Sequence, residues 1–447
     1  MHHKLHDNWQ QVLASRGDSV ALTDAESGEV WSFHALDHRA VEWLATHAPL
    51  PDAIGKVWCL ALTDRVEWMA VFLAAIKAGA VVLPLEPAAI DTLRNQALAQ
   101  GAEFLIDDSG VHLLGMGSAR PGFFLIKLTS GTTGAAKALP FIELEMLADG
   151  AQIMRSMSIS AQDRNYAIIP LGHSYGLGNL VMPFFMAGVP IVLASSPYPQ
   201  VMVEELTQFP CTVLPLVPPL VKALSMVSLE SKPLPGLRLV ISAGSALATK
   251  VAQDFNENVG LPVHNFYGSS ETGGICFDRT GVLPKVAGAV GTAMDGVKLS
   301  IGEDQSIQVQ SKAVCHAAYH DGICTLHDFG QLDEAGTLHL VGRHADIVKI
   351  AGRRVSLSEI ELALCALDGV SDAYVSSRVG RSGELRCVAL FLGSAESDAV
   401  KANLLLTTLP DWKRPKTLRK VDHILYNARG KIDRKAMEQT VDAAIAR

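Results

Sequence analysis

The chain has few cysteines, and their spacing gives them no shared role. The seven cysteines among 447 residues are scattered and odd in number, and none forms a Cys-x-x-Cys pair. This pattern argues against a zinc knuckle and against a disulfide framework. It predicts reduced thiols in a cytoplasmic protein. The first residues are also too polar for a secretion signal, which agrees with that location.

Blocks of positive charge and uninterrupted hydrophobic runs are missing as well. The formal net charge is −8, and Lys and Arg are not clustered. Because nucleic acids favour clustered cations, we expect no nucleic-acid partner. The stretch from Asn165 to Val203 contains no charged residue, but glycine and proline interrupt it repeatedly. We therefore expect buried strands and a helix beside a core or an apolar pocket, and no membrane span.

Three segments share one order of elements: a helix, a glycine and a short strand. They lie at residues 67–85, 181–194 and 250–263. Glycine commonly follows the last turn of a helix, because it adopts the left-handed conformation without strain. Helices that alternate with short β-branched strands predict doubly wound sheets.

The expected fold class is α/β, with a large N-terminal domain at residues 1–342 and a small α+β C-terminal domain at 343–447. Within the large domain, we expect one doubly wound lobe at about 1–120 and a second at 121–285. Short alternating strands with glycines at 286–342 predict a small β-barrel-like subdomain. A length of 447 residues supports more than one domain.

The run Lys127-Leu-Thr-Ser-Gly-Thr-Thr-Gly-Ala-Ala-Lys137 has the composition of a phosphate-binding loop. Glycines let the backbone approach a phosphate, and hydroxyls and a lysine supply donors and charge. The apolar residues before it predict a buried strand that ends at the loop. The spacing differs from a Walker P-loop, because only two residues separate Gly131 from Gly134. A surface turn is the alternative.

A second cluster, Asn265-Phe-Tyr-Gly-Ser-Ser-Glu-Thr-Gly273, follows another predicted strand. Tyr267 is suited to stack on a base, and the Glu271 carboxylate is the kind of ligand that Mg²⁺ prefers. The alternative is a helix start, with Ser269 or Ser270 as the N-cap and Glu271 in the first turn.

Three further clusters are unspecific when taken alone. They are Thr325-Leu-His-Asp-Phe-Gly330, the segment from Arg343 to Arg354, and Arg429-Gly-Lys-Ile-Asp-Arg434. An aspartate before glycine usually belongs to a turn, and an exposed lysine is usually solvated. These three clusters become informative only through their order along the chain, after the two clusters above.

Together, the five motifs resemble the adenylate-forming superfamily: acyl- and aryl-CoA ligases, luciferases and the adenylation domains of peptide synthetases. The resemblance covers about residues 127–434. The loop matches Thr-Ser-Gly-Thr-Thr-Gly-x-x-Lys, and the second cluster matches Tyr-Gly-x-Thr-Glu with Ser270 in place of threonine. Asp328 matches the acidic ribose-binding position, Gly342-Arg343 the entry to a hinge, and Gly430-Lys431 the terminal catalytic lysine.

The resemblance implies roles for individual residues in a nucleotide site. The ATP phosphates would contact Thr129, Ser130, Gly131, Thr132, Thr133, Gly134 and Lys137. Adenine would lie against Asn265 and Tyr267, with Gly244, Gly268 and Ser269 completing the nucleotide site. Asp328 and Arg343 would hold the ribose, while Ser270 and Glu271 would serve the α-phosphate and Mg²⁺.

The resemblance also implies an acid pocket and a moving C-terminal domain. The pocket would contain His173, Tyr175, Gly176 and Leu177, with Gly244 and Gly268. For His173, the alternative is a core histidine whose hydrogen bonds are satisfied within the protein. Lys431 would bridge the acid and the phosphate during adenylation. Rotation about a hinge at Ala345 and Asp346, within residues 343–346, would then replace Lys431 by the segment around Lys349. Relatives commonly have Asp or Lys where this chain has Ala345.

The expected substrate is a small non-amino carboxylic acid, aryl or acyl. Relatives that activate amino acids place an aspartate shortly after the histidine motif, whereas this chain has no acidic residue between Asp163 and Glu204. A buried ammonium without a partner would be costly. Tyr175, Leu177, Leu180 and Val181 would suit an aromatic or medium aliphatic chain.

The thiol that accepts the acyl group is expected to be coenzyme A, whose phosphates Arg353 or Arg354 would contact. The phosphopantetheine of an acyl carrier protein is the alternative acceptor. Two other readings remain open: a catalytically silent protein that binds adenylates or acyl groups, and a luciferase-like oxidase that shares the first step. Retention of Lys137, Glu271 and Lys431 argues against the silent protein. A homodimer is a reasonable expectation.

Overall fold

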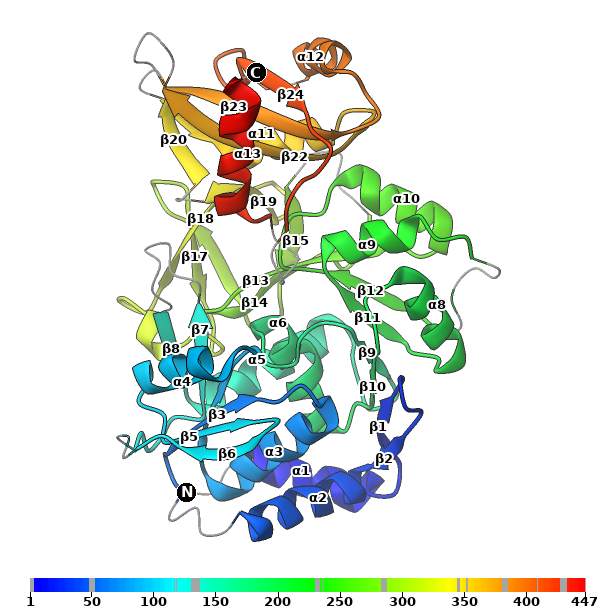
Figure 1. Ribbon diagram of the computed structural model, residues 1–447, viewed down its shortest axis with the longest axis vertical. Coiled ribbons are helices and arrows are strands. Elements are labelled where there is room, and N and C mark those ends of the chain that lie inside the picture. The colour runs from blue at the N-terminus through cyan, green and yellow to red at the C-terminus, as the bar shows by residue number, and fades with distance from the viewer. Residues whose placement is uncertain are drawn as a thin grey trace.

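The structure is a computed structural model in which two sheets share helices between them and a smaller unit carries the C-terminus (Figure 1). It describes residues 4–47, 53–115, 117, 119–129, 137–229, 234, 236–282, 288–343, 346–350, 353–379, 385–407, 409–426 and 432–446. Within these residues the strands form sheets of six, thirteen, two and three strands. None of the helices in the described part is long and apolar enough to cross a membrane.

The six-stranded sheet has the order β6-β5-β3-β4-β7-β8. Its strands are β3 (Val57–Ala61), β4 (Val81–Pro84), β5 (Phe104–Asp107), β6 (Gly110–Leu113), β7 (Leu125–Thr129) and β8 (Lys137–Phe141). Helices α3 (Arg65–Ala78) and α4 (Ile90–Ala99) connect parallel strands. Helix α3 is buried along almost its whole length, which explains why apolar residues occur on all its faces.

The thirteen-stranded sheet has the order β16-β17-β18-β19-β15-β14-β13-β12-β11-β9-β10-β1-β2. Its parallel part contains β1 (Val20–Asp24), β9 (Asn165–Ala167), β10 (Ile191–Leu193), β11 (Val213–Leu216), β12 (Leu239–Ser242) and β13 (Val263–Ser269), with β2 (Val30–Ser32) antiparallel at the edge. The antiparallel part contains β14 (Gly273–Phe277), β15 (Ala289–Ala293), β16 (Lys298–Ile301), β17 (Ser306–Gln310), β18 (Cys324–Leu332) and β19 (Thr337–Arg343).

Helices cover both parts of this sheet and fill the space next to the smaller one. They are α1 (Lys4–Arg16), α2 (Phe33–Thr46), α5 (Glu143–Ser156), α6 (Ser174–Gly176), a π-helical turn η1 (Leu177–Val181), α7 (Met182–Ala187), α8 (Pro199–Gln208), α9 (Pro218–Ser225), α10 (Thr249–Val259) and a 3-10 turn η2 (His316–Ala318). An aromatic cluster of Trp9, Phe33, Phe184 and Phe185 lies in the largest core, with ring centroids 5.0 to 5.8 Å apart. The charge-poor stretch is therefore buried core, as expected.

The C-terminal unit has an α+β arrangement, as expected. Its strands are β20 (Ile347–Ile350), β21 (Arg353–Ser356), β22 (Val370–Val379), β23 (Leu385–Gly393) and β24 (Thr417–Lys420), and its helices are α11 (Leu357–Cys365), α12 (Ser397–Leu405) and α13 (Arg434–Ala446). The unit has a core of its own, which includes Ile360, Val375 and Phe391. It also contacts the large part of the chain, where Lys222 Nζ on α9 donates to the carbonyl oxygen of Ser371 at 3.0 Å.

The mixed α/β class and the helix–glycine–strand segments are confirmed. Helices α3, α7 and α10 each end at a glycine with positive φ, at Gly79, Gly188 and Gly260. The sheets, however, do not follow the subdomain boundaries expected from the sequence. Strand β1 joins the thirteen-stranded sheet beside β10, whereas β7 and β8 complete the six-stranded one.

The strands expected to form a separate barrel-like subdomain continue the large sheet as its antiparallel part. These differences share a physical cause. Pairing such as Leu22 with Ile191 joins segments far apart along the chain, and local patterns carry no information about such partners.

Candidate nucleotide and acid site

The predicted phosphate loop lies between two antiparallel strands. Thr129 at the end of β7 pairs with Lys137 at the start of β8, and the two ends of the loop are therefore neighbours. The Thr129 hydroxyl donates to the Lys137 carbonyl at 3.4 Å, and the Lys137 side chain is exposed. A Walker loop leads from a strand into a helix, so this hairpin supports the distinction made from the spacing. Ser130, Gly131, Thr132, Thr133 and Gly134 lie outside the described residues.

The predicted adenine and ribose residues meet on the thirteen-stranded sheet. The Tyr267 hydroxyl on β13 donates to Asp328 Oδ2 on β18 at 2.6 Å. Asp328 in turn is paired across the strands with Arg343 on β19, whose side chain lies outside the described part. Asn265 is buried, and its amide donates to the carbonyl of Ala289 at 3.0 Å. Four predicted nucleotide residues thus lie on β13, β18 and β19 of one sheet, and the hydrogen bond from Tyr267 to Asp328 joins β13 to β18.

The segment after Tyr267 is a tight turn between β13 and β14. The Ser269 hydroxyl accepts a hydrogen bond from the Thr272 N–H at 3.2 Å, so the turn is closed by a side chain. The alternative of a helix start at Ser269 or Ser270 is therefore wrong. Gly268 permits a close approach, because a Cβ atom there would lie 2.5 Å from the Gly273 carbonyl oxygen. The Glu271 carbonyl accepts from the N–H of Cys315 at 2.8 Å.

The predicted acid-pocket segment lies against this turn. Ser174 at the start of α6 donates from its hydroxyl to the Ser270 hydroxyl at 3.3 Å. The preceding residue, His173, is partly exposed, and its Nε2 contacts a carboxylate oxygen of Glu86. The alternative of a core histidine is therefore wrong. Glu86 lies two residues after β4 of the six-stranded sheet, so this contact joins a segment that follows β4 to the segment that precedes α6.

Sequence reasoning missed Glu86. One feature of the sequence pointed to a role for Glu86: it lies just after the buried strand β4, at the edge of a parallel sheet where ligands often bind. No acidic residue near the histidine motif pointed to it, because Glu86 comes from a distant part of the chain.

Two other residues predicted for the acid pocket, Tyr175 and Gly176, pack against neighbouring segments. Tyr175 has its hydroxyl 3.4 Å from the Ile241 carbonyl, and its ring centroid lies 5.7 Å from that of Phe266. Burial raises the pKa of Tyr175 well above its ordinary value, so the phenol is neutral. Gly176 is closely packed, because a Cβ atom there would lie 2.0 Å from the Pro170 carbonyl oxygen.

Leu177, Leu180 and Val181 are fully buried within the largest core. Any contact of theirs with an acid stays a prediction. Gly244 follows β12 with φ of +94°, a conformation that favours glycine, and a Cβ atom there would meet only Val217 within 4 Å. The Gly244 main chain is thus open on one side, as a segment between a nucleotide and an acid requires.

A buried charged pair lies beneath these motifs, and sequence reasoning did not assign it. Lys127 on β7 is 4% exposed, and Asp149 on α5 is 2% exposed. Lys127 Nζ lies 4.2 Å from the centre of the Phe141 ring and has no hydrogen-bond partner among the described residues. Burial lowers the pKa of Lys127 and raises that of Asp149, while the attraction between the two opposes both changes.

Asp149 also joins the pair to the turn that carries Glu271. Its Oδ1 accepts from the Gly274 N–H at 2.9 Å, and Glu271 lies close enough to act on the Lys127 charge. The strand before the phosphate loop is therefore linked electrostatically to β14. The signal in the sequence was a single lysine inside the apolar run that precedes the loop.

One other group of potential metal ligands occurs among the described residues. Ligand atoms of Glu145, Cys315 and His316 lie within 4.8 Å of one another. The Glu145 carboxylate already accepts from the N–H groups of Ile142 at 2.9 Å and His316 at 2.7 Å. These bonds account for it as a structural acceptor at the start of α5. Glu271, the predicted Mg²⁺ ligand, lies outside this group.

The remaining predicted residues concern the C-terminal unit. Lys349 lies on β20 opposite Arg354, and both side chains fall outside the described part. Asp346 is buried just before β20. Ala345 and Lys431 lie outside the described residues.

Comparisons with known proteins agree with this geometry. A family model described as AMP-binding enzyme matches residues 123–313. 4-Coumarate–CoA ligase 5 of Oryza sativa subsp. japonica is 24% identical over 518 residues, which cover 99% of this chain and 96% of that protein. Naringenin synthase of Pestalotiopsis fici is 25% identical over 421 residues, which cover 84% of this chain but 15% of that protein.

A solved structure shows the same fold. ATP-bound MatB from Rhodopseudomonas palustris has a TM-score of 0.85 and 21% identity, and the match covers 98% of this chain and 99% of MatB. The family match and the ligase relatives support an AMP-forming acid–thiol ligase of the acyl/aryl-CoA ligase type within the adenylate-forming superfamily.

Proposed function

We propose that this ligase activates a non-amino aryl or acyl carboxylic acid with ATP and transfers the acyl group to coenzyme A. One observation carries the proposal: a single hairpin, β13–β14, joins both halves of the site. Tyr267 on this hairpin is bonded to Asp328, and Ser270 at its turn contacts Ser174 of the acid-pocket segment. A nucleotide held by the hairpin would lie next to the acid.

The reaction follows from this placement. A carboxylate oxygen attacks the α-phosphorus; the bond to pyrophosphate breaks, and an acyl adenylate forms. The thiolate of the acceptor then attacks the acyl carbon, a thioester forms, and AMP leaves with its electron pair. In our proposal, Lys137 and the hydroxyls of the phosphate loop stabilise the charge on the leaving pyrophosphate, and Lys431 stabilises the charge that develops at the reacting acid and phosphate.

The residues at the turn fit a magnesium ion. Ser270 and Glu271 offer hard oxygen donors at a turn that is only partly buried. Mg²⁺ bound there would neutralise phosphate charge. Independently of the ion, the Ser269 hydroxyl and the Glu271 carbonyl fix the turn through their bonds to Thr272 and Cys315.

Two features support an acid with no charge besides its carboxylate. No acidic residue occurs between Asp163 and Glu204 to pair with an ammonium. The carboxylate that the structure does add, Glu86, is engaged with His173. A second carboxylate on the substrate would be repelled by Glu86 if it lay on this side of the pocket.

The first experiment is a panel of aryl, medium aliphatic, amino and dicarboxylic acids, each incubated with ATP and Mg²⁺. Pyrophosphate release should depend on an aryl or aliphatic acid that carries no charge besides its carboxylate. Coenzyme A and a phosphopantetheinylated carrier protein are then compared as acceptors of the activated acid. Faster transfer to the carrier would contradict coenzyme A as the acceptor, and no release with any acid would contradict the enzymatic proposal.

The second experiment separates the two steps. Lys431→Ala should nearly abolish adenylate formation, whereas Lys349→Ala should mainly slow thioester formation from a supplied adenylate. Lys435→Ala is the matched control, because Lys435 is an exposed lysine on α13 four positions further along. Equal losses of both half-reactions in the first two variants would contradict the two-conformation mechanism.

A further inference from the structure

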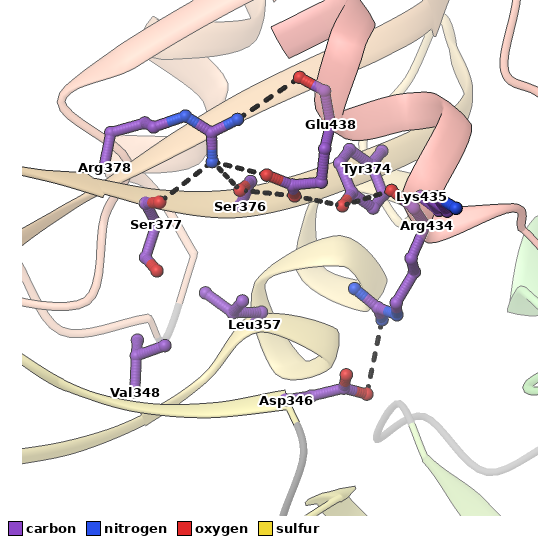
Figure 2. A pocket seen from close by; sticks show the side chains of 10 residues that line it. All are labelled: Asp346, Val348, Leu357, Tyr374, Ser376, Ser377, Arg378, Arg434, Lys435 and Glu438. Atoms are coloured by element: carbon purple, nitrogen blue, oxygen red, sulfur yellow. Dashed lines mark hydrogen bonds and ion pairs between the residues drawn. The ribbon is translucent and has the colours of Figure 1, made fainter. Parts of the chain in front are cut away.

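A pocket of about 320 Å³ in the C-terminal unit brings together two motifs that are distant in the sequence. Figure 2 shows Arg434, at the start of α13, pointing toward Asp346 of the predicted hinge. Arg434 Nη2 donates to Asp346 Oδ2 at 3.3 Å and to Glu361 Oε2 at 3.2 Å. One guanidinium therefore binds two carboxylates.

The two carboxylates are largely shielded from water, the Arg434 side chain is 38% exposed, and a hydroxyl further fixes the contact. The side chains of Asp346 and Glu361 are 11% and 12% exposed. Ser358 on α11 donates to the same Asp346 oxygen at 2.9 Å. Removal of Arg434 would leave two buried carboxylates without their cation, which is a strongly unfavourable arrangement. Asp346 is thus held firmly within the C-terminal unit.

Arg434 also lies at the base of the segment that carries Lys431. Two residues before Arg434, Ile432 forms an antiparallel bridge with Tyr426. The Asp433 N–H donates to the Leu425 carbonyl at 2.8 Å. These pairs bring the two ends of residues 427–431 together, so whatever fixes Arg434 also fixes the origin of that segment.

We propose that Arg434 is a positioning residue that couples the hinge to the lysine segment. With Asp346, it holds the base of residues 427–431 at a fixed place relative to the hinge, so that Lys431 is carried as part of one rigid body when the C-terminal unit turns. Arg343 belongs to β19 of the large sheet, whereas Asp346 is bound within the C-terminal unit. This inference rests on the proposed role of Lys431.

The same pocket contains a matched control residue. Arg378 on β22 lines the pocket as well, and it binds Glu438 of α13 at 2.6 Å (Figure 2). It also binds Asp442 of α13 at 2.8 Å. Its partners among the described residues belong to β22 and α13, and they do not include Asp346. Loss of Arg378 therefore removes contacts of α13 that lie about one and two turns beyond Arg434, while the ion pair between Arg434 and Asp346 stays in place.

The test measures both half-reactions in single turnovers, using the best acid from the panel. Arg434→Gln and Asp346→Asn should slow adenylate formation roughly 10- to 100-fold, because a displacement of about 1 Å can cost that much. Thioester formation from a supplied adenylate should change less than about threefold, as should both half-reactions of Arg378→Gln. Asp346→Asn is nearly isosteric, so it carries the test if Arg434→Gln fails to fold.

Two results would overturn the proposal. Equal slowing of both half-reactions in Asp346→Asn would mean a general structural role. Behaviour of Asp346→Asn and Arg434→Gln identical to that of Arg378→Gln would remove the coupling altogether. If the unmodified enzyme releases no pyrophosphate with any acid, the proposed function itself fails. If the unmodified enzyme is active and the variants have the same half-reaction rates, only the proposed role of Arg434 is refuted.

Discussion

Lys127→Met tests the buried pair beneath the phosphate loop. The substitution keeps the length of the side chain and removes its charge. Asp149 then remains 2% exposed and loses the attraction of the Lys127 charge, while it still accepts a hydrogen bond from the Gly274 N–H of the large sheet. We expect the free energy of unfolding to fall by about 1 to 3 kcal/mol at pH 8, the usual cost of leaving a buried polar group poorly compensated.

The loss should depend on pH, because Asp149 can take up a proton instead. Burial already raises the pKa of Asp149, and without Lys127 that pKa should rise further. A carboxyl group with a raised pKa stabilises the fold below its ordinary pKa and loses this contribution as pH increases through the raised value. The variant should therefore lose stability with rising pH by at most about 1.4 kcal/mol per pH unit more than the unmodified protein.

The assay is urea unfolding followed by tryptophan fluorescence. Five tryptophans precede residue 70, namely Trp9, Trp31, Trp43, Trp58 and Trp68, so the signal reports mainly the N-terminal part. Lys127→Met/Asp149→Asn is the matched control, because it removes both charges and should recover most of the lost stability. The reasoning would be refuted if Lys127→Met were as stable as the unmodified protein. It would also be refuted if the double variant were no more stable than Lys127→Met.

Two further predictions concern the C-terminal unit. Burial raises the pKa of Glu361 to about 7, from an ordinary value of 4.5, although Arg434 opposes the change. The stability that this proton gives is present below pH 4.5 and lost as pH rises through 7, so Glu361→Gln should gain roughly 2 to 3 kcal/mol relative to the unmodified protein between pH 5 and pH 8. Thermal unfolding at the two pH values measures this gain. The same difference in stability between the variant and the unmodified protein at pH 5 and at pH 8 would refute it. Gly342→Ala should destabilise the unit by about 1 to 3 kcal/mol, because its Cβ would lie 2.1 Å from Ser356 Oγ, which caps α11. Ser356→Gly should relieve this loss in the double variant, and strict additivity in thermal unfolding would contradict the clash.

The sequence predicted local elements well where the physical signal was local. Helix α3 ends at Gly79, as its composition indicated, because a glycine with φ of 70° meets no Cβ penalty. The strand before the phosphate loop and the strand before Tyr267 also lie where apolar runs placed them. The order of the motifs was enough to predict the family.

The parts that sequence reasoning missed depend on contacts between distant segments. Glu86, which follows β4, contacts His173 from a distant part of the chain, and Lys127 on β7 interacts electrostatically with Asp149 on α5. The turn at Ser269 was ambiguous, because serine favours both helix starts and turns, and only the pairing of β13 with β14 decides between them. Membership of β1 in the larger sheet was equally invisible to local patterns.

The residues that we propose for the nucleotide site belong to different sheets: Lys137 begins β8 of the smaller sheet, and Tyr267 lies on β13 of the larger one. Helices α1, α5 and α7 contribute to the core that the two sheets share. In the proposed site, the distance that a triphosphate would span is therefore set partly by hydrophobic side chains of these helices. Substitutions in the shared core would then change the geometry of the proposed site without contacting the nucleotide.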